Sequence, residues 1–222
     1  RDQPRSRGLG DVYKRQLQFI THPSDRYTIP EEVQMAIEGG CKWIQLRMKD
    51  ATYDEMKSTA LEIIPMCREN DIILVIDDNV ELVNELRVHG VHLGKNDMDP
   101  RKAREILGPH AIIGVTANTA DDILSFHGID VDYVGVGPFR HTTTKKNLAP
   151  VIGLDGYKDI VAKVTAAGNK LPLVAIGGIT LEDVTGIMAT GVQGIAVSGS
   201  IINAPDPVRY TTQLLNALNP DN

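Results

Sequence analysis

Short apolar runs alternate with longer amphipathic segments from residue 17 almost to the end of the chain. Each short run is bounded by glycine or polar residues, which is typical of a strand buried on both faces. Glycines often precede these runs, where they are expected to end the preceding helix. The predicted strands are 17–21, 43–47, 72–76, 90–93, 111–115, 133–136, 173–176 and 194–197. The predicted helices are 31–38, 53–68, 80–86, 101–107, 120–127, 156–167, 181–189 and 207–218.

Eight strand–helix units of this length favour an α/β fold with a single (β/α)8 TIM barrel over residues 17–222. An open, doubly wound sheet is the alternative, but that fold usually carries a glycine-rich turn after its first strand. Here the turn reads Thr-His-Pro-Ser at 21–24, which is no dinucleotide-binding fingerprint. In a barrel, the chemistry is expected at the carboxyl ends of the strands.

Residues 1–16 differ from the rest because they are polar, rich in arginine and glycine, and without any apolar period. Residues 11–16 resemble the in-frame translation of a transposon mosaic-end adapter used in sequencing libraries. We therefore expect residues 1–16 to be a non-native or disordered N-terminal extension. A natural basic arm or a targeting peptide is the alternative. Asp2, Asp11 and the lack of an apolar stretch fit targeting poorly.

Composition and charge exclude several classes of partner. Aromatic residues make up only 5% of the 222 residues, which argues against base-stacking platforms. The formal net charge is -6, which argues against binding to nucleic acid or an anionic membrane. Because the net charge is negative, cations that bind a phosphate must be gathered at one local site. The hydrophobic share of 42% is ample for a full core.

The two cysteines, Cys41 and Cys67, are too few for a disulfide scaffold and lack metal-ligand spacing. We expect them to be buried thiols in a reducing compartment, so the expected location is cytoplasmic. No apolar run approaches the ~18 residues of a membrane span, and no signal peptide is visible. The sequence leaves the oligomeric state open, a homo-oligomer included.

Polar side chains follow the second predicted strand in an alternating pattern. Gln45, Arg47 and Lys49 can share one face because strand side chains alternate, while Leu46 and Met48 then face the helices. In a barrel this places an amide and two cations in the mouth. The alternative is an exposed edge strand with solvated charges, but a closed barrel has no edge.

Carboxylates follow the third and fourth strands. Asp77 and Asp78 end one apolar run, and Asp97 lies just beyond the next. Two carboxylates from neighbouring loops suit Mg²⁺, which completes its shell with water and substrate phosphate. Asp78 or Asn79 could instead cap the helix that follows, and taken alone that explanation is at least as good.

Two further regions are expected to bind anions. Gly137 and Pro138 end the sixth strand, and a loop of hydroxyls and cations follows, with Thr142, Thr144 and Lys145 among them. Gly177 and Gly178 follow strand seven, and Ser198 and Gly199 follow strand eight. In phosphate-binding barrels these last two loops form a cup with a short extra helix, here predicted near 199–203. Tight turns that serve only packing are the alternative.

The mouth thus combines a neutral cup for a monophosphate with a cationic, metal-binding region for a pyrophosphate. Two phosphorylated substrates and Mg²⁺ suggest a transfer reaction in which pyrophosphate leaves. Four segments in this order resemble the thiamine phosphate synthase family: Gln-Leu-Arg-x-Lys at 45–49, Gly-Val-His-Leu-Gly-x-x-Asp at 90–97, Gly-Pro…Thr-x-Thr-Lys at 137–145 and Ile-Gly-Gly-Ile at 176–179. The likeness covers essentially the whole chain from residue 17.

The resemblance implies a (β/α)8 barrel that joins hydroxymethylpyrimidine diphosphate to hydroxyethylthiazole phosphate, giving thiamine phosphate and pyrophosphate. By position, the pyrimidine diphosphate would be held by Gln45, Arg47, Lys49, Asp77, Thr116 and Lys145, of which Arg47, Lys49 and Lys145 would also act in catalysis. Asp78 and Asp97 would bind Mg²⁺. The thiazole phosphate would be held by Thr142, Thr144, Gly177, Gly178, Ser198 and Gly199.

Two of these positions depart from the family pattern. Thr116 stands where the family usually has serine, which keeps the hydroxyl. Asp77 stands where the family commonly has asparagine, and an ionised carboxylate cannot donate a hydrogen bond as an amide can. Asp77 could therefore serve as a further metal carboxylate or be protonated. His92, in the fourth strand, is expected to be a hydrogen-bonded structural histidine.

The family chemistry needs no nucleophilic side chain, because the aminopyrimidine ring expels pyrophosphate to give a carbocation that the thiazole nitrogen captures. Three alternatives remain: a thiazole tautomerase, a non-catalytic thiazole-phosphate sensor, and another phosphosugar barrel enzyme. Arg47, Lys49, Asp78, Asp97 and Lys145 together argue against the tautomerase, which has no pyrophosphate to bind. No central acid–base residue supports the phosphosugar enzyme.

Overall fold

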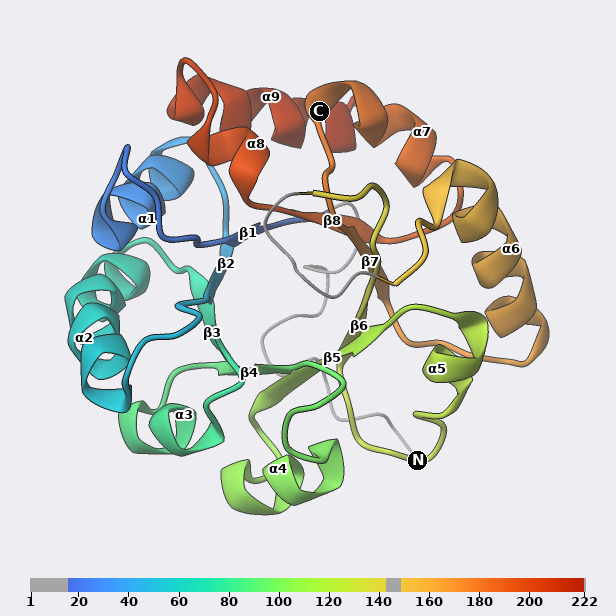
Figure 1. The fold of residues 1–222 in the computed structure, drawn as a ribbon, viewed down its shortest axis with the longest axis horizontal. Coiled ribbons are helices and arrows are strands. Elements are labelled where there is room, and N and C mark those ends of the chain that lie inside the picture. Colours follow the sequence, from blue (N-terminus) through green and yellow to red (C-terminus); the bar gives the residue numbers. More distant parts are fainter. Residues whose placement is uncertain (1–15, 143–148, 222) are drawn as a thin grey trace.

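The computed structural model describes residues 16–142 and 149–221, and its strands close into a parallel barrel in chain order (Figure 1). The first strand pairs in parallel with both the second and the eighth, which closes the ring. The strands are β1 (Gln16–Ile20), β2 (Trp43–Leu46), β3 (Ile73–Asp77), β4 (Gly90–Leu93), β5 (Ile112–Ala117), β6 (Tyr133–Val136), β7 (Leu173–Ile176) and β8 (Gly194–Val197). The predicted (β/α)8 barrel is confirmed.

Helices surround the barrel on its outside (Figure 1). They are α1 (Ile29–Glu38), α2 (Tyr53–Glu69), α3 (Val80–Leu86), α4 (Pro100–Leu107), α5 (Ala120–Leu124), α6 (Gly153–Ala166), η1 (Leu181–Asp183), α7 (Val184–Met188), α8 (Gly199–Ile202) and α9 (Pro207–Leu218). The predicted helix 181–189 divides into η1 and α7, because the Asp183 carboxylate accepts the N–H of Thr180 and tightens the first turn. The short helix expected near 199–203 is α8.

The first strand begins inside the range predicted to be an extension. Gln16 belongs to β1, where it pairs with Gly194 of β8. The rest of that predicted segment, residues 1–15, lies outside the described residues, as do 143–148.

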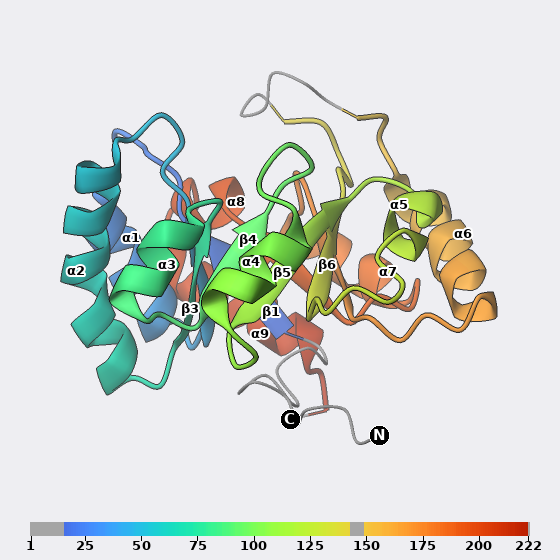
Figure 2. The ribbon, with the colours of Figure 1, turned by 90° about the horizontal axis from the view of Figure 1, so that it is seen from below.

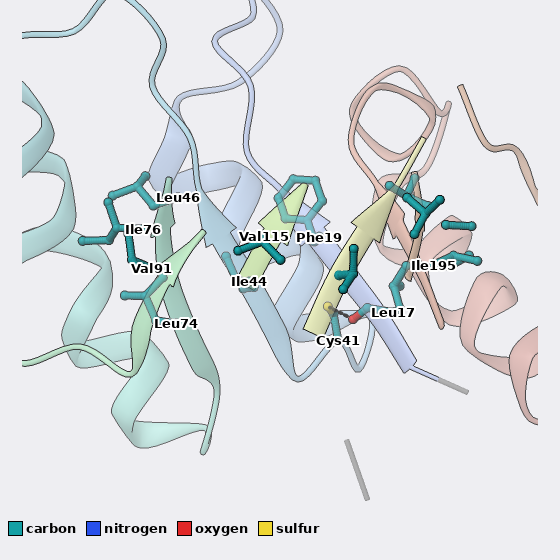
Figure 3. Close-up of a cluster of buried hydrophobic side chains, with 14 of the residues drawn as sticks. Leu17, Phe19, Cys41, Ile44, Leu46, Leu74, Ile76, Val91, Val115 and Ile195 are labelled. Carbon is teal, nitrogen blue, oxygen red and sulfur yellow. Dashed lines mark hydrogen bonds between the residues drawn. The ribbon is translucent and has the colours of Figure 1, made fainter. Parts of the chain in front are cut away.

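Alternation along the strands divides the apolar side chains into two layers. One layer lies between the barrel and the helices, and Figure 3 shows part of it, where Leu46, Ile76 and Val91 from three adjacent strands lie together. The other layer fills the barrel interior and includes Trp43 and Tyr133. Their rings meet edge to face with centroids 4.8 Å apart, a favourable geometry for aromatic pairs.

All strands run the same way, so their carboxyl ends open at one end of the barrel. In Figure 2 the β4–α4 loop and the described flanks of the β6–α6 segment extend from that same end. The residues predicted to bind ligands follow or end these strands. Closure of the sheet therefore brings segments far apart in the sequence to a common rim.

The start of β4 allows a direct test of strand packing. An ideal Cβ on Gly90 would lie 2.0 Å from the carbonyl oxygen of Ile112 on β5. We expect Gly90→Ala to lower the free energy of unfolding by about 3 kcal/mol, because the backbone of the neighbouring strand must move. Urea and thermal unfolding measure this.

The matched control is Gly186→Ala in α7, where the nearest atom to an added Cβ is Leu154 Cδ1 at 3.4 Å, an ordinary contact. That change should leave stability unchanged or raise it by up to about 1 kcal/mol, because alanine favours a helix over glycine. Equal stability of the two variants would contradict the packing described here.

Candidate active site

The side chains at the end of β2 become more exposed from the barrel interior to its mouth. Gln45 is buried, Arg47 is half-buried and Lys49 is exposed. Thr21, just after β1, fixes this end, because its Oγ1 accepts the Arg47 N–H at 2.9 Å and donates to the Arg47 carbonyl at 3.0 Å. Leu46 is buried among the helices as expected. Since β2 pairs with both β1 and β3, the edge-strand interpretation is wrong.

Asp77, at the end of β3, forms an ion pair with Arg47 of the neighbouring strand. Arg47 Nε lies 3.8 Å from Asp77 Oδ2. A nearby cation favours the ionised carboxylate, so the pair stabilises negative charge at Asp77. The position where the family commonly has an amide thus places an acceptor beside the arginine that is expected to bind a diphosphate.

Asp78 and Asp97 form the carboxylate pair that the sequence predicts. The Asp78 pKa is raised, first by partial burial and then by the charge and hydrogen bonding of the Asp97 carboxylate. Asp97 is held by its own loop, where Gly94 N–H donates to Asp97 Oδ2 at 2.6 Å. Helix α3 is capped by Asn79, which accepts the Leu82 N–H at 3.0 Å, so Asp78 is not needed as a cap.

Asp78 also has a left-handed backbone, with φ of 65°. A strained residue whose carboxylate meets another carboxylate is costly without a counter-ion. Two adjacent carboxylates fit Mg²⁺, which takes one or two protein carboxylates and fills the remaining positions with water and phosphate. Within residues 16–142 and 149–221, no group of three or more His, Cys, Asp or Glu could hold a metal ion, so an ion at this pair would depend on water and phosphate for its other ligands.

Below the mouth, a line of hydrogen-bonded polar side chains crosses the barrel interior. His92 Nε2 lies 3.0 Å from Thr116 Oγ1, and His92 Nδ1 lies 2.8 Å from the Tyr133 hydroxyl. The expectation of a hydrogen-bonded histidine is confirmed. Tyr133 and Gln18 were missed by the sequence reasoning. The available signal was a glutamine within the apolar run Leu-Gln-Phe-Ile at 17–20.

The glycine turn after β7 meets the loop after β6 closely. Gly177 and Gly178 have φ of 110° and 64°, which favour glycine. An added Cβ on Gly178 would lie 3.0 Å from Arg140 Cβ and 3.1 Å from Thr142 Cγ2. The predicted Thr142 therefore lies against this turn. Thr144 and Lys145 lie outside the described residues.

An ion pair that the sequence did not suggest holds these two loops together. Arg140 reaches both carboxylate oxygens of Asp183 at 2.8 and 3.0 Å and also donates to the Gly178 carbonyl. A bidentate arginine–carboxylate pair is geometrically specific. Arg140 and Asp183 thus fix the position of the glycine turn.

The loop after β8 supplies the remaining predicted cup residues. Ser198 Oγ is buried and has no hydrogen-bond partner among the described residues. A buried hydroxyl without a partner is costly, which is consistent with a ligand that supplies one. Gly199 begins α8 directly afterwards.

The β1–α1 loop lies beside the cationic side of the mouth. His22 N–H donates to Glu32 Oε1 at 3.0 Å, and the charge of Arg47, after burial, lowers the His22 pKa. Glu32 itself is fully buried, and its Oε2 has no hydrogen-bond partner among the described residues. Burial raises the pKa of Glu32 to about 7, although the His22 N–H acts in the opposite direction.

Comparisons with known proteins show the family to which this barrel belongs. The family model described as thiamine monophosphate synthase matches residues 17–201. The chain belongs to this family. A thiamine-phosphate synthase from Bacteroides fragilis strain ATCC 25285 is 55% identical over 200 residues, which is 90% of this chain and 98% of the relative. One from Flavobacterium psychrophilum is 45% identical over 201 residues, which is 89% of this chain and 96% of the relative.

A solved structure is also similar. Thiamine phosphate pyrophosphorylase from Pyrococcus furiosus superimposes with a TM-score of 0.83 at 32% identity, covering 94% of this chain and 98% of that one. The family predicted from the sequence is therefore confirmed, and the relatives' name denotes the transferase class that was expected. Among the described residues, no helix has the length and apolar character needed to cross a membrane.

Glu32 predicts a pH dependence of stability. Its carboxyl loses a proton near pH 4.5 when unfolded but near 7 when folded, so the native state becomes less stable as pH rises between these values. Glu32→Gln removes this loss and keeps the acceptor for His22 N–H. We expect the variant to gain ~2 kcal/mol relative to the parent between about pH 5 and pH 8.

Urea unfolding at several pH values measures the gain. Glu38→Gln, an exposed position on the same helix, is the control and should follow the parent at every pH. Parallel curves for Glu32→Gln and the parent would show that the buried carboxyl does not titrate in this range.

Proposed function

We propose that this chain is a thiamine phosphate synthase, which transfers the hydroxymethylpyrimidine group from its diphosphate to hydroxyethylthiazole phosphate and releases pyrophosphate. The observation that carries this proposal is the carboxylate pair Asp78–Asp97 beside the Arg47–Asp77 ion pair, with the glycine turn after β7 on the other side of the barrel. One region suits a metal-bound diphosphate and the other suits a monophosphate. The names and identities of the relatives support the same reaction.

The diphosphate is bound on the β2–β4 side of the mouth. Arg47 and Lys49 attract its oxygens, and Lys145 adds a third cation from the loop after β6. Asp78 and Asp97 would hold Mg²⁺, which would neutralise the charge of the departing pyrophosphate. Thr21 fixes the Arg47 backbone and Asp77 pairs with its guanidinium, so the positive charge is in position before the bond breaks.

The pyrimidine leaves the diphosphate as a carbocation, and no protein nucleophile takes part. Cys41 and Cys67 are buried, and burial raises their pKa values to about 11 and about 12. Thiols of this kind are unreactive. Gln45, Asp77 and Thr116 orient the ring instead. Free, buried cysteines also support our proposal that the protein works in the reducing cytoplasm.

The thiazole phosphate is bound at the β6–β8 side, where Arg140 and Asp183 hold the glycine turn in place. Backbone N–H groups there donate hydrogen bonds to an anion without adding positive charge to the site. Phosphate oxygens would also satisfy the Ser198 hydroxyl. The phosphate is contacted by Gly177, Gly178, Ser198, Gly199, Thr142 and Thr144. Binding both substrates together places the thiazole nitrogen close to the pyrimidine methylene carbon.

Turnover tests this proposal. The purified chain is incubated with both substrates, with Mg²⁺ or with a chelator, and thiamine phosphate and pyrophosphate are measured. We expect Mg²⁺-dependent product and a loss of at least about 100-fold in turnover for Asp78→Asn, because one of two metal carboxylates is removed. Asp99→Asn is the control, since Asp99 is an exposed cap of α4 that asparagine can replace.

Absence of product from folded protein that still binds thiazole phosphate would favour the sensor, and an isomerised thiazole would favour the tautomerase. Equal activity of Asp78→Asn and Asp99→Asn would contradict the proposed metal site.

A cation in the loop after β6 is tested separately. We expect Lys145→Ala to lower turnover by about 100-fold while the unfolding transition stays within about 0.5 kcal/mol, because the lysine acts on the leaving pyrophosphate rather than on the core. Lys158→Ala, an exposed position on α6, is the control. Near-normal turnover of Lys145→Ala would contradict the assigned role.

A further inference from the structure

A chain of hydrogen bonds crosses the barrel interior and joins two residues expected to contact the pyrimidine. It runs from Gln45 on β2 through Gln18 on β1, Tyr133 on β6 and His92 on β4 to Thr116 on β5. The first four side chains are at most 8% exposed, and Thr116 is half-buried. Buried chains of this kind hold their members in one arrangement because every lost bond is costly.

The two glutamine amides give the chain of hydrogen bonds its direction. Gln45 Nε2 donates to Gln18 Oε1 at 3.1 Å, and Gln18 Nε2 donates to the Tyr133 oxygen at 3.3 Å. We assign the single phenol proton to the contact with His92 Nδ1 at 2.8 Å. An imidazole that accepts at Nδ1 carries its proton on Nε2, from where it donates to Thr116 Oγ1 at 3.0 Å.

The two ends of the chain are therefore of opposite character. Gln45 uses its amide donor inside the barrel and retains Oε1, which accepts no hydrogen bond from the described residues. With His92 protonated at Nε2, Thr116 accepts inside the barrel at 3.0 Å and retains its own proton for a ligand. One end offers an acceptor and the other offers a donor.

The neighbouring strands are shaped to admit the two rings of the chain. A Cβ on Gly114 would lie 2.1 Å from Tyr133 Cζ, and one on Gly135 would lie 3.3 Å from His92 Cε1. The Tyr133 ring thus occupies space that any other side chain at position 114 would fill, and the His92 ring lies in tight contact with position 135. Trp43 packs edge to face on Tyr133 and holds it from a third strand.

We propose that Gln18 and Tyr133 are positioning residues that fix the hydrogen-bond polarity of the pyrimidine site, with the acceptor at Gln45 and the donor at Thr116. An aminopyrimidine has the matching groups, an amino N–H donor and ring nitrogens that accept. A 4-oxo analogue has the opposite pattern, because a carbonyl replaces the amino group and a ring N–H replaces an acceptor. This chain of hydrogen bonds therefore selects aminopyrimidines over their oxo analogues. This inference rests on the proposed function.

The His92 tautomer tests the direction of the chain without any turnover. ¹⁵N NMR of the full-length protein at mildly alkaline pH should report the His92 proton on Nε2. The His92 signals are assigned by comparison with His92→Gln. In Tyr133→Phe, which removes the phenol proton, the tautomer should become mixed. A proton on Nδ1 in the parent protein reverses every bond in the chain and overturns the proposal.

Substrate discrimination tests the function of the chain. Calorimetry with hydroxymethylpyrimidine diphosphate and with its 4-oxo analogue, both with Mg²⁺, should give tighter binding of the amino form by at least about tenfold. Tyr133→Phe should reduce this ratio about tenfold, because His92 is then free to present either polarity at Thr116. KM for the thiazole phosphate should stay unchanged.

Tyr157→Phe is the matched control. Tyr157 is as buried as Tyr133 and its hydroxyl also donates a buried hydrogen bond, at 2.6 Å to the Val136 carbonyl, but it lies on α6 outside the chain. Tyr157→Phe should keep the amino-to-oxo ratio. A conservative pair adds a second check: Thr116→Ser should retain the ratio, and Thr116→Val should lose it.

The outcomes separate this inference from the proposed function. Normal synthesis of thiamine phosphate with no amino preference, or with an equal loss of preference in Tyr133→Phe and Tyr157→Phe, overturns the inference and leaves the synthase intact. Absence of synthesis overturns the proposed function. If neither pyrimidine diphosphate binds, the positioning role is overturned as well, whatever the His92 tautomer.

Discussion

Closure of the eight-stranded sheet is the constraint on which the rest of this molecule depends. Because β1 pairs with both β2 and β8, no strand has a free edge, and every side chain must point into the barrel or toward the helices. The same closure collects the carboxyl ends of all strands at one rim. Loops that are more than a hundred residues apart in sequence thereby become walls of one site.

The barrel interior must also be filled, and it is filled in two different ways. Apolar side chains and the Trp43–Tyr133 pair form one layer, and the hydrogen-bonded chain from Gln45 to Thr116 forms the other, with Tyr133 belonging to both. The rings fit because glycines stand opposite them on β5 and β6. The interior is thus both the core and the floor of the candidate site, so packing and ligand recognition constrain the same residues.

The distribution of charge at the rim differs from the net charge of the molecule. The chain is negative overall, yet two cations, Arg47 and Lys49, lie together at the end of β2. Asp78 lies against Asp97, and neither carboxylate of this pair neutralises the other. Like charges so close cost stability, which is typical of sites built to bind a cation. Other pairs instead join a loop to a helix start: Arg140 after β6 pairs with Asp183 of η1, and Lys95 after β4 pairs with Asp122 of α5.

The sequence by itself determined the architecture, because short apolar runs and amphipathic segments alternate with the period of each element, and the observed strands fall on the predicted runs. It also placed Gln45, Arg47, Asp78 and Asp97 at or just after the carboxyl ends of their strands, where a barrel is expected to bear its chemistry. It could not find Gln18, Tyr133, Arg140 or Asp183, which look like ordinary core or loop residues. Their roles come from partners on distant strands and loops. Only the tertiary structure decides such pairings, because a hydrogen bond depends on distance and direction in space, and neither follows from spacing along the chain.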